Sequence, residues 1–277
     1  MEKQKNKLMT MIRKNLDIMH IPLMSILPGQ ISFFVILSVV PLLSILAMII
    51  SKLSFSFEMV GYVIDSCLPT GISSIVFSIF EQQRVGAADI FFIITAFYLA
   101  SKATHSIIVA STTIYNGKQT DFIRTRVKAI IMLIILVILV ISLIGILTVG
   151  GRIVNYLGKV NDNMIPIWVH IYEILKYPLV FFMIFFVVKV VYTISPNVAI
   201  PSKSVNKGAL LTTVIWVVST FMFSFYVTNI ANYSKFYGNL SNLIIVMIWI
   251  YWLCYVFVFG MTFNEYNLTN KGNKESV

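Results

Sequence analysis

Two side chains that can carry a positive charge, Lys102 and His105, stand in the middle of a long apolar stretch of this chain. Their spacing of three residues puts them on one face of a helix. An ionisable group at membrane depth costs about 2.5–3.5 kcal/mol on insertion scales, so it usually faces a cavity or a partner. One interpretation is a cationic site for an anionic headgroup, with Ser101 adding a hydrogen bond. The other is structural: Lys102 extends toward the headgroups, or pairs with Glu173 or a backbone carbonyl.

Glu173 and Lys176 form a second pair with a spacing of three residues. We expect them near the outer membrane interface, where an exposed ion pair contributes only about 0–1 kcal/mol. This pair is structural unless Glu173 turns inward to Lys102.

The remaining candidate ligand-binding residues are polar positions at helix ends. Gln30 begins the first apolar stretch, and Tyr237 and Asn239 precede the last one. Gly238 permits a tight turn and Asn239 can cap a helix, so a structural role explains these residues as well as a headgroup contact does. Arg124, Arg126 and Lys128 form a basic loop, which indicates contact with anionic lipid headgroups and a determinant of topology.

Catalytic motifs are not found. His20, His105 and His170 lie on separate segments without a closely spaced carboxylate or cysteine set, so we expect no metal and no catalytic residue. The sequence has no phosphate-binding loop and no nucleophile elbow, and we expect no cofactor. The residues therefore argue against an enzyme, and a ribonuclease would need an acid–base pair that cannot be named here. Cys67 and Cys254 fall on different predicted segments, which argues against a disulfide framework.

Composition identifies the class of protein. Hydrophobic residues make up 58% of the 277 residues, charged residues 12%, and the mean hydropathy is +0.88, whereas soluble domains have roughly half and a quarter. The net charge of +10 is explained by Lys and Arg facing anionic lipid. We expect no nucleic-acid partner, because no basic-aromatic module surrounds these charges.

Hydropathy predicts an all-α polytopic membrane protein with six crossings. The crossings cover about 30–50, 89–113, 129–149, 167–194, 208–227 and 240–263. Residues 1–28 form a basic amphipathic segment on the cytoplasmic face, broken by Pro22 and Pro28; 29–266 form the membrane domain; and 267–277 form a cytoplasmic tail. Within the membrane domain, 52–87 predict two amphipathic helices on the outer face. Pro41 and Pro178 are expected to bend the first and fourth crossings.

The orientation follows from Lys and Arg. The N-terminus, the 114–128 loop, the 189–207 segment and the tail hold five, four, three and two, against two, two and one in the alternate loops. Both termini are therefore predicted to be cytoplasmic.

Several motifs resemble the YihY/BrkB family of envelope proteins. They are the first helix GQISFFVILSVVPLLSIL, the segment ASKATHSIIVASTTIYNGKQTDFIRTRVKAI, and 193–264 with TISPN, Tyr237-Gly238, the Trp-x-Tyr pattern and Gly260-x-x-x-Asn264. The resemblance implies a six-helix inner-membrane protein associated with envelope integrity. The family tends to have arginine where Lys102 stands, and lysine lacks the bidentate geometry of arginine.

Two functions follow as hypotheses. The first is binding or passage of an anionic lipid or amphiphile through a cavity between the first, second, fifth and sixth helices, with Lys102 as counter-ion. The aromatic residues of the last helix are expected to pack against protein rather than form this site. The second is an envelope scaffold that docks a protein partner through 52–87. The sequence leaves the oligomeric state open.

Overall fold

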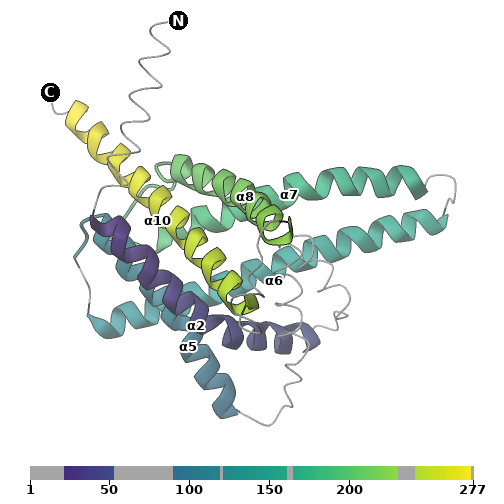
Figure 1. The fold of residues 1–277 in the computed structure, drawn as a ribbon, viewed down its shortest axis with the longest axis horizontal. Helices are drawn as coiled ribbons and strands as arrows, with labels where there is room; N and C mark the ends of the chain where they lie inside the picture. Colours follow the sequence, from purple (N-terminus) through teal and green to yellow (C-terminus); the bar gives the residue numbers. More distant parts are fainter. Residues whose placement is uncertain (1–21, 53–89, 119–120, 161–164, 230–240, 276–277) are drawn as a thin grey trace, which may run out of the picture.

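The computed structural model describes residues 22–52, 90–118, 121–160, 165–229 and 241–275. Within these ranges the chain forms helices and no strand, so the predicted all-α class is confirmed for them. The helices are α2 (Pro22–Lys52), α5 (Ile90–Ile114), α6 (Phe122–Val160), α7 (Ile165–Ile194), α8 (Asn206–Asn229) and α10 (Ser241–Glu275) (Figure 1). The predicted cytoplasmic segment up to residue 21, the outer amphipathic segment from residue 53, and Tyr237, Gly238 and Asn239 lie outside the described residues.

The predicted crossings coincide with helices, but α2, α6 and α10 are much longer than predicted. α6 begins at Phe122 rather than at Ala129, and α10 continues to Glu275 rather than ending at Phe263. With 39 and 35 residues and a rise of about 1.5 Å per residue, they are about 58 and about 52 Å long. Both exceed a hydrocarbon core of about 30 Å. The prediction fell short because charged residues end an apolar run without ending a helix.

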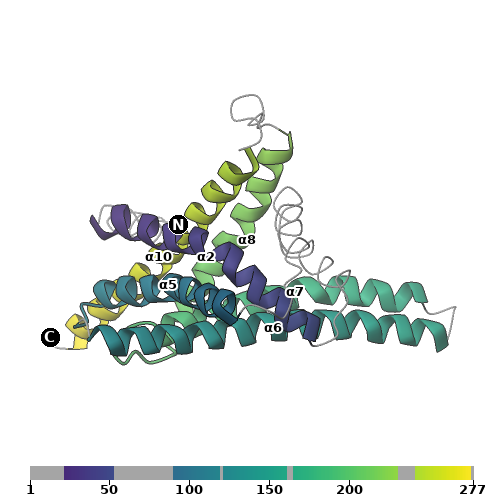
Figure 2. The same ribbon diagram turned by 90° about the horizontal axis from the view of Figure 1, so that it is seen from below.

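The predicted break at Pro28 is wrong. α2 begins at Pro22, a position where proline is favoured because the missing N–H would have no intrahelical partner. It then continues through Pro28, which removes one hydrogen bond, while Met24 and Ile31 on either side are buried in the core. This packing holds the helix together across the proline. α2 does change direction part-way along (Figures 1 and 2), as expected for a helix with Pro28 and Pro41 in its interior.

Four stretches of the described residues are long and apolar enough to cross a membrane. They are Phe122–Leu143, Ile174–Ile194, Asn206–Val227 and Leu243–Thr269, on α6, α7, α8 and α10. Only 11–39% of the residues in their most apolar windows are buried within the protein. Exposed apolar surface on this scale requires a membrane or a partner, and four such helices indicate a membrane protein.

The core gathers at one end of the helices. It contains residues from the beginnings of α2, α6 and α8 and from the ends of α5 and α7 and the second half of α10: Met24, Ala129, Ala209, Ile114, Tyr192 and Met261. Successive helices therefore run in opposite directions. From this core α6 and α7 extend side by side away from the other helices, and α8 runs beside α10 (Figures 1 and 2).

α5 contributes small side chains to the core and packs against α2 and α6. Its buried small residues are Ala100, Ser101, Ala103, Thr104, Ser106, Ala110, Ser111 and Thr112. Small residues let helix backbones approach closely. The Thr104 Oγ1 atom donates a hydrogen bond of 2.8 Å to the carbonyl of Ala129. This contact places the beginning of α6 beside the middle of α5.

A buried tyrosine joins α7, α8 and α10. Tyr192 is fully buried, and its hydroxyl donates a hydrogen bond of 2.6 Å to the carbonyl of Phe257. The Thr212 hydroxyl lies 2.7 Å from the hydroxyl oxygen of Tyr192 and donates a hydrogen bond to it, because the Tyr192 proton is used at Phe257. Each polar atom in this set therefore has a partner within the protein.

Asn264 adds a second contact between the same helices. Its Oδ1 atom accepts a hydrogen bond of 2.7 Å from the Gly208 N–H, and its Nδ2 atom donates to the carbonyl of Val205 at 3.1 Å. The Gly208 N–H lies in the first turn of α8, where it lacks an intrahelical partner. Gly208 and Gly260 allow this approach, because a Cβ at either position would collide with the facing helix. We call Tyr192, Thr212, Gly208, Gly260 and Asn264 the polar node.

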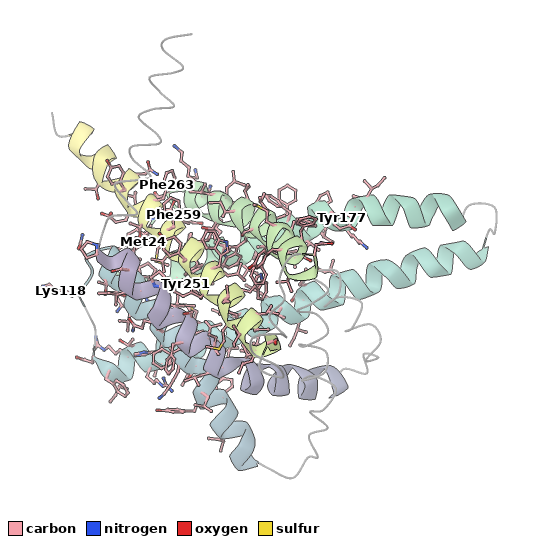
Figure 3. All side chains as sticks on the ribbon, viewed as in Figure 1. Met24, Lys118, Tyr177, Tyr251, Phe259 and Phe263 are labelled. Atoms are coloured by element: carbon pink, nitrogen blue, oxygen red, sulfur yellow. The ribbon has the colours of Figure 1, made fainter. Side chains whose placement is uncertain are left out.

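The last helix, α10, is predicted to pack its aromatic residues Trp249, Tyr251, Trp252 and Tyr255 against protein, and the structure shows this for two of them. Trp249 and Tyr255 pack against the core, whereas Tyr251 and Trp252 are 44% and 42% exposed. Figure 3 shows the described side chains. Met24 lies there beside the part of α10 that carries the labelled Phe259 and Phe263, and the Thr262 hydroxyl contacts the Met24 sulfur at 3.7 Å.

Candidate functional site

Lys102 lies over an aromatic ring of its own helix. Its Nζ atom is 5.5 Å from the centroid of the Tyr98 ring, one turn earlier on α5. Tyr98 is about half exposed and Lys102 is partly buried. The spacing of Tyr98, Lys102 and His105 places all three on one face of α5, as predicted for the last two.

Arg126 reaches the same ring from α6. Its Cζ atom lies 4.2 Å from the Tyr98 ring centroid, and its Nη2 atom donates a hydrogen bond of 3.1 Å to the Tyr98 carbonyl. The Thr104 to Ala129 contact explains this approach, since it brings the first turns of α6 against α5. Two cations from two helices therefore share one ring.

His105 and Phe122 complete the arrangement. Their ring centroids are 6.3 Å apart, and His105 lies close enough to Arg126 and Lys102 for both charges to act on its ring. We call Tyr98, Lys102, His105, Phe122 and Arg126 the basic site. It combines two basic side chains, one imidazole ring and two further aromatic rings.

The basic site has no acidic partner among the residues that the structure describes. An ion pair among the described residues lies outside the basic site and joins Arg124 to Asp121 at 4.0 Å, with both side chains at least 80% exposed. Such a pair contributes little free energy. Within the described ranges, the charges of Lys102 and Arg126 therefore face an aromatic ring and a carbonyl but no acid, and their combined field favours a bound anion.

The expected cavity between the first, second, fifth and sixth helices, which are α2, α5, α8 and α10, stays a prediction. The structure adds a second cation at the same ring as Lys102, namely Arg126 of α6, the third crossing. The sequence did not predict this neighbour, because α6 begins beside the middle of α5 rather than beyond its end.

The other candidates from the sequence have separate positions. Ser101 is fully buried, and its hydroxyl donates to the Tyr98 carbonyl at 2.8 Å, so it supports the backbone that Arg126 also contacts. Gln30 is half-buried on α2. Lys176 is buried on α7 with its Nζ atom 5.2 Å from the Tyr177 ring. The Glu173 side chain, Tyr237 and Asn239 lie outside the described part of the structure.

Lys128 has a structural role that the sequence did not indicate. Its ammonium donates three hydrogen bonds, to the carbonyls of Ser195 (2.9 Å) and Pro196 (2.6 Å) and to the Asn197 Oδ1 atom (2.9 Å). All three of its N–H groups are thereby used within the protein. Lys128 thus binds the α7–α8 connector to α6. Arg124, which the prediction grouped with Lys128, has an exposed side chain instead.

Sequence reasoning missed Tyr98 and treated Arg126 only as a topology signal. Tyr98 stands four residues before Lys102, a spacing that predicts contact on a helix. Nothing comparable in the sequence links Arg126 to Tyr98, since that contact depends on how α6 crosses α5. No three His, Cys, Asp or Glu side chains come together as a metal site within the described ranges.

Known proteins similar to this chain include membrane proteins. A relative named ribonuclease-like protein YfkH, from Bacillus subtilis (strain 168), is 29% identical over 231 residues, which cover 80% of this chain and 82% of the relative. A UPF0761 membrane protein of Chromobacterium violaceum is 32% identical over 79 residues, which cover 28% of this chain and 19% of the relative. One from Enterobacter sp. (strain 638) is 28% identical over 79 residues, which cover 27% of each chain. This chain thus spans less than a third of the length of the two UPF0761 proteins.

No solved structure matches this chain. The family described as Virulence factor BrkB matches residues 23–276, a range that includes both helices of the basic site and the whole polar node. The match spans the same motifs on which the resemblance rested: the first helix, the segment with Lys102 and Arg126, and the region ending at Asn264. This chain therefore belongs to the Virulence factor BrkB family.

Proposed function

We propose that this BrkB family membrane protein binds the headgroup of an anionic lipid or amphiphile at the basic site. The observation that carries the proposal is that Lys102 and Arg126 lie over one Tyr98 ring without an acidic partner among the described residues. A phosphate or carboxylate between them would supply the missing charge. Arg126 can bind such a group in the bidentate manner and Lys102 as a point charge.

We further propose that all six described helices cross the inner membrane, with both termini cytoplasmic. Two observations support this topology. Successive helices run in opposite directions, and Lys and Arg concentrate in the N-terminal segment, the 114–128 and 189–207 connectors and the tail. With this topology α6 enters the membrane from the cytoplasmic side, and its first turns line the basic site. A polar ligand would then reach the site from the cytoplasmic leaflet.

We propose a binding or transport role rather than an enzymatic one. The name of YfkH suggests nuclease chemistry for that relative. In this chain, His105 has an aromatic ring and two cations as its nearest described partners. General acid–base cleavage of RNA would require a second titratable group beside it. No observation on the described residues favours the scaffold alternative, because its docking segment lies outside them.

The test is equilibrium binding of phosphatidylglycerol to the purified protein, with phosphatidylcholine as the neutral comparison. Lys102→Ala and Arg126→Ala should each weaken phosphatidylglycerol binding about fivefold, since one basic group near the membrane surface contributes about 1 kcal/mol. Lys118→Ala, which removes an exposed lysine from the loop after α5 (Figure 3), is the control. Equal affinity of the wild type for both lipids would contradict the proposal. Leaflet exchange in proteoliposomes, compared between wild type and Lys102→Ala, then tests whether binding leads to passage.

A further inference from the structure

A stripe of exposed aliphatic side chains begins at the basic site and follows α6. Its members are Ile123, Val127, Ile131, Ile134 and Ile138, and each is between 44% and 75% exposed. Their spacings of four, four, three and four residues keep them on one face of the helix. The opposite face, which carries Thr125, Ala129 and Met132, is buried against the protein.

Two arginines flank the first turn of this stripe. At 3.6 residues per turn, Arg124 falls on one side of the Ile123–Val127 line and Arg126 on the other. Arg126 reaches from there to Tyr98, whereas the Arg124 side chain is 80% exposed. An apolar ridge therefore starts between two guanidinium groups, which matches the chemistry of a lipid whose phosphate and acyl chain are adjacent.

The stripe is longer than the hydrocarbon part of one leaflet. From Ile123 to Ile138 the helix rises about 22 Å. Half of a hydrocarbon core of about 30 Å is about 15 Å, so the stripe covers the distance from the headgroup region past the bilayer midplane. An acyl chain that leaves a phosphate at the basic site would meet apolar side chains along its whole length.

We propose that the α6 stripe seats an acyl chain of the same anionic phospholipid whose headgroup binds the basic site, so that the ligand is a lipid held at both ends rather than a free anion. This inference rests on the proposed headgroup site. The charge of the flanking arginines and the continuity of the stripe with the basic site identify the occupant. Other apolar faces, such as the one on α8 that includes Val214 and Val218, would contact membrane lipids without selecting for charge.

The experiment is photo-crosslinking in vesicles of phosphatidylcholine that contain a small fraction of a probe lipid with a photoactivatable acyl chain. The probe is phosphatidylglycerol in one set and phosphatidylcholine in the other, and mass spectrometry locates the labelled residues. We expect the phosphatidylglycerol probe to label the α6 stripe about tenfold more than the phosphatidylcholine probe does, since each basic group near the surface strengthens binding several-fold. Labelling of the Val214–Val218 face of α8 should be equal for the two probes.

Three outcomes separate this inference from the proposed function. Loss of the α6 enrichment in Lys102→Ala and Arg126→Ala supports both. Equal labelling of α6 and α8 by the phosphatidylglycerol probe, while those variants still weaken phosphatidylglycerol binding, overturns the acyl-chain seat and leaves the headgroup site. Unlabelled glycerol phosphate that competes as strongly as phosphatidylglycerol also overturns it, because a free anion would then suffice.

Discussion

The basic site and the polar node are two polar regions in an apolar helix bundle, and they differ in how their polar groups are satisfied. In the polar node, the Tyr192 hydroxyl and the Asn264 amide have hydrogen-bond partners within the protein. In the basic site, the charges of Lys102 and Arg126 have an aromatic ring and a carbonyl, but no acid among the described residues. Internal partners indicate a structural role, whereas unmatched charge indicates a ligand.

The polar node and the basic site also differ in how far their side chains are exposed. Thr212 and Asn264 are fully buried and Gly208 is buried, so a change there alters packing and the free energy of unfolding. Tyr98 is 51% exposed, and a change there should alter binding more than stability. Variants of the two regions should therefore separate into two classes, and the following predictions test that separation.

The largest effect is expected for Gly260→Ala. Its Cβ would collide with the Thr212 hydroxyl and approach the Tyr192 hydroxyl at 2.6 Å and the Gly208 carbonyl at 3.0 Å. We expect a loss of about 3 kcal/mol in the free energy of unfolding, because the Thr212 and Tyr192 hydroxyls would have to move and lose their hydrogen bonds. The midpoint of thermal unfolding, measured on the purified protein in detergent, reports this loss. The control is Gly145→Ala on α6, where nothing lies within 4 Å of the added Cβ; equal midpoints for the two variants would contradict the tight α8–α10 contact.

Asn264→Ala should be the next most destabilising. It leaves the buried Gly208 N–H without its acceptor, at a cost of about 2–3 kcal/mol. The matched control is Asn229→Ala, which removes an exposed amide that bonds only to the Phe225 carbonyl of its own helix among the described residues. A midpoint unchanged by Asn264→Ala would show that water replaces the amide and that the polar node is not sealed.

Lys128→Met tests whether basic residues of one helix can belong to different classes. It removes three hydrogen bonds to the α7–α8 connector, and we expect a loss of about 2 kcal/mol in the free energy of unfolding. Phosphatidylglycerol binding per folded molecule should stay unchanged. Lys118→Met provides the control for removing a basic residue from the surface. Lower affinity at full stability would reverse the assignment and place Lys128 with the ligand-binding residues.

The smallest effect is expected for Tyr98→Leu. The ring lies under two cations, and its loss should weaken phosphatidylglycerol binding about fivefold, the effect of about 1 kcal/mol from the lost cation–π contacts. The unfolding midpoint should barely change, because the Tyr98 side chain is half exposed. Tyr251→Leu on α10, with similar exposure, should leave binding unaltered. A large drop in stability with unchanged binding would move Tyr98 into the structural class.

Local pattern in the sequence predicted the helices and part of the basic site. The bounds of α5, α7 and α8 follow from the lengths of apolar runs, and the shared face of Lys102 and His105 follows from a spacing of three residues. These are properties of one helix, so the chain encodes them within a few turns. The same reasoning failed at Pro28 and at the start of α6, where packing and helix continuation outweighed the residues that usually end a helix.

Taken alone, the sequence determined that the chain is a helical membrane protein, that it resembles the BrkB family, and that Lys102 and His105 share a helix face. Only the tertiary structure decided that Arg126 joins Lys102 at Tyr98 and that Lys128, two residues later, fastens a connector instead. The physical reason is that apolar helices rich in small residues can pack in many registers with similar burial. Specific contacts, such as the Thr104 to Ala129 hydrogen bond and the Gly208–Gly260 approach, select one of them. That register determines which cations meet and which are neutralised.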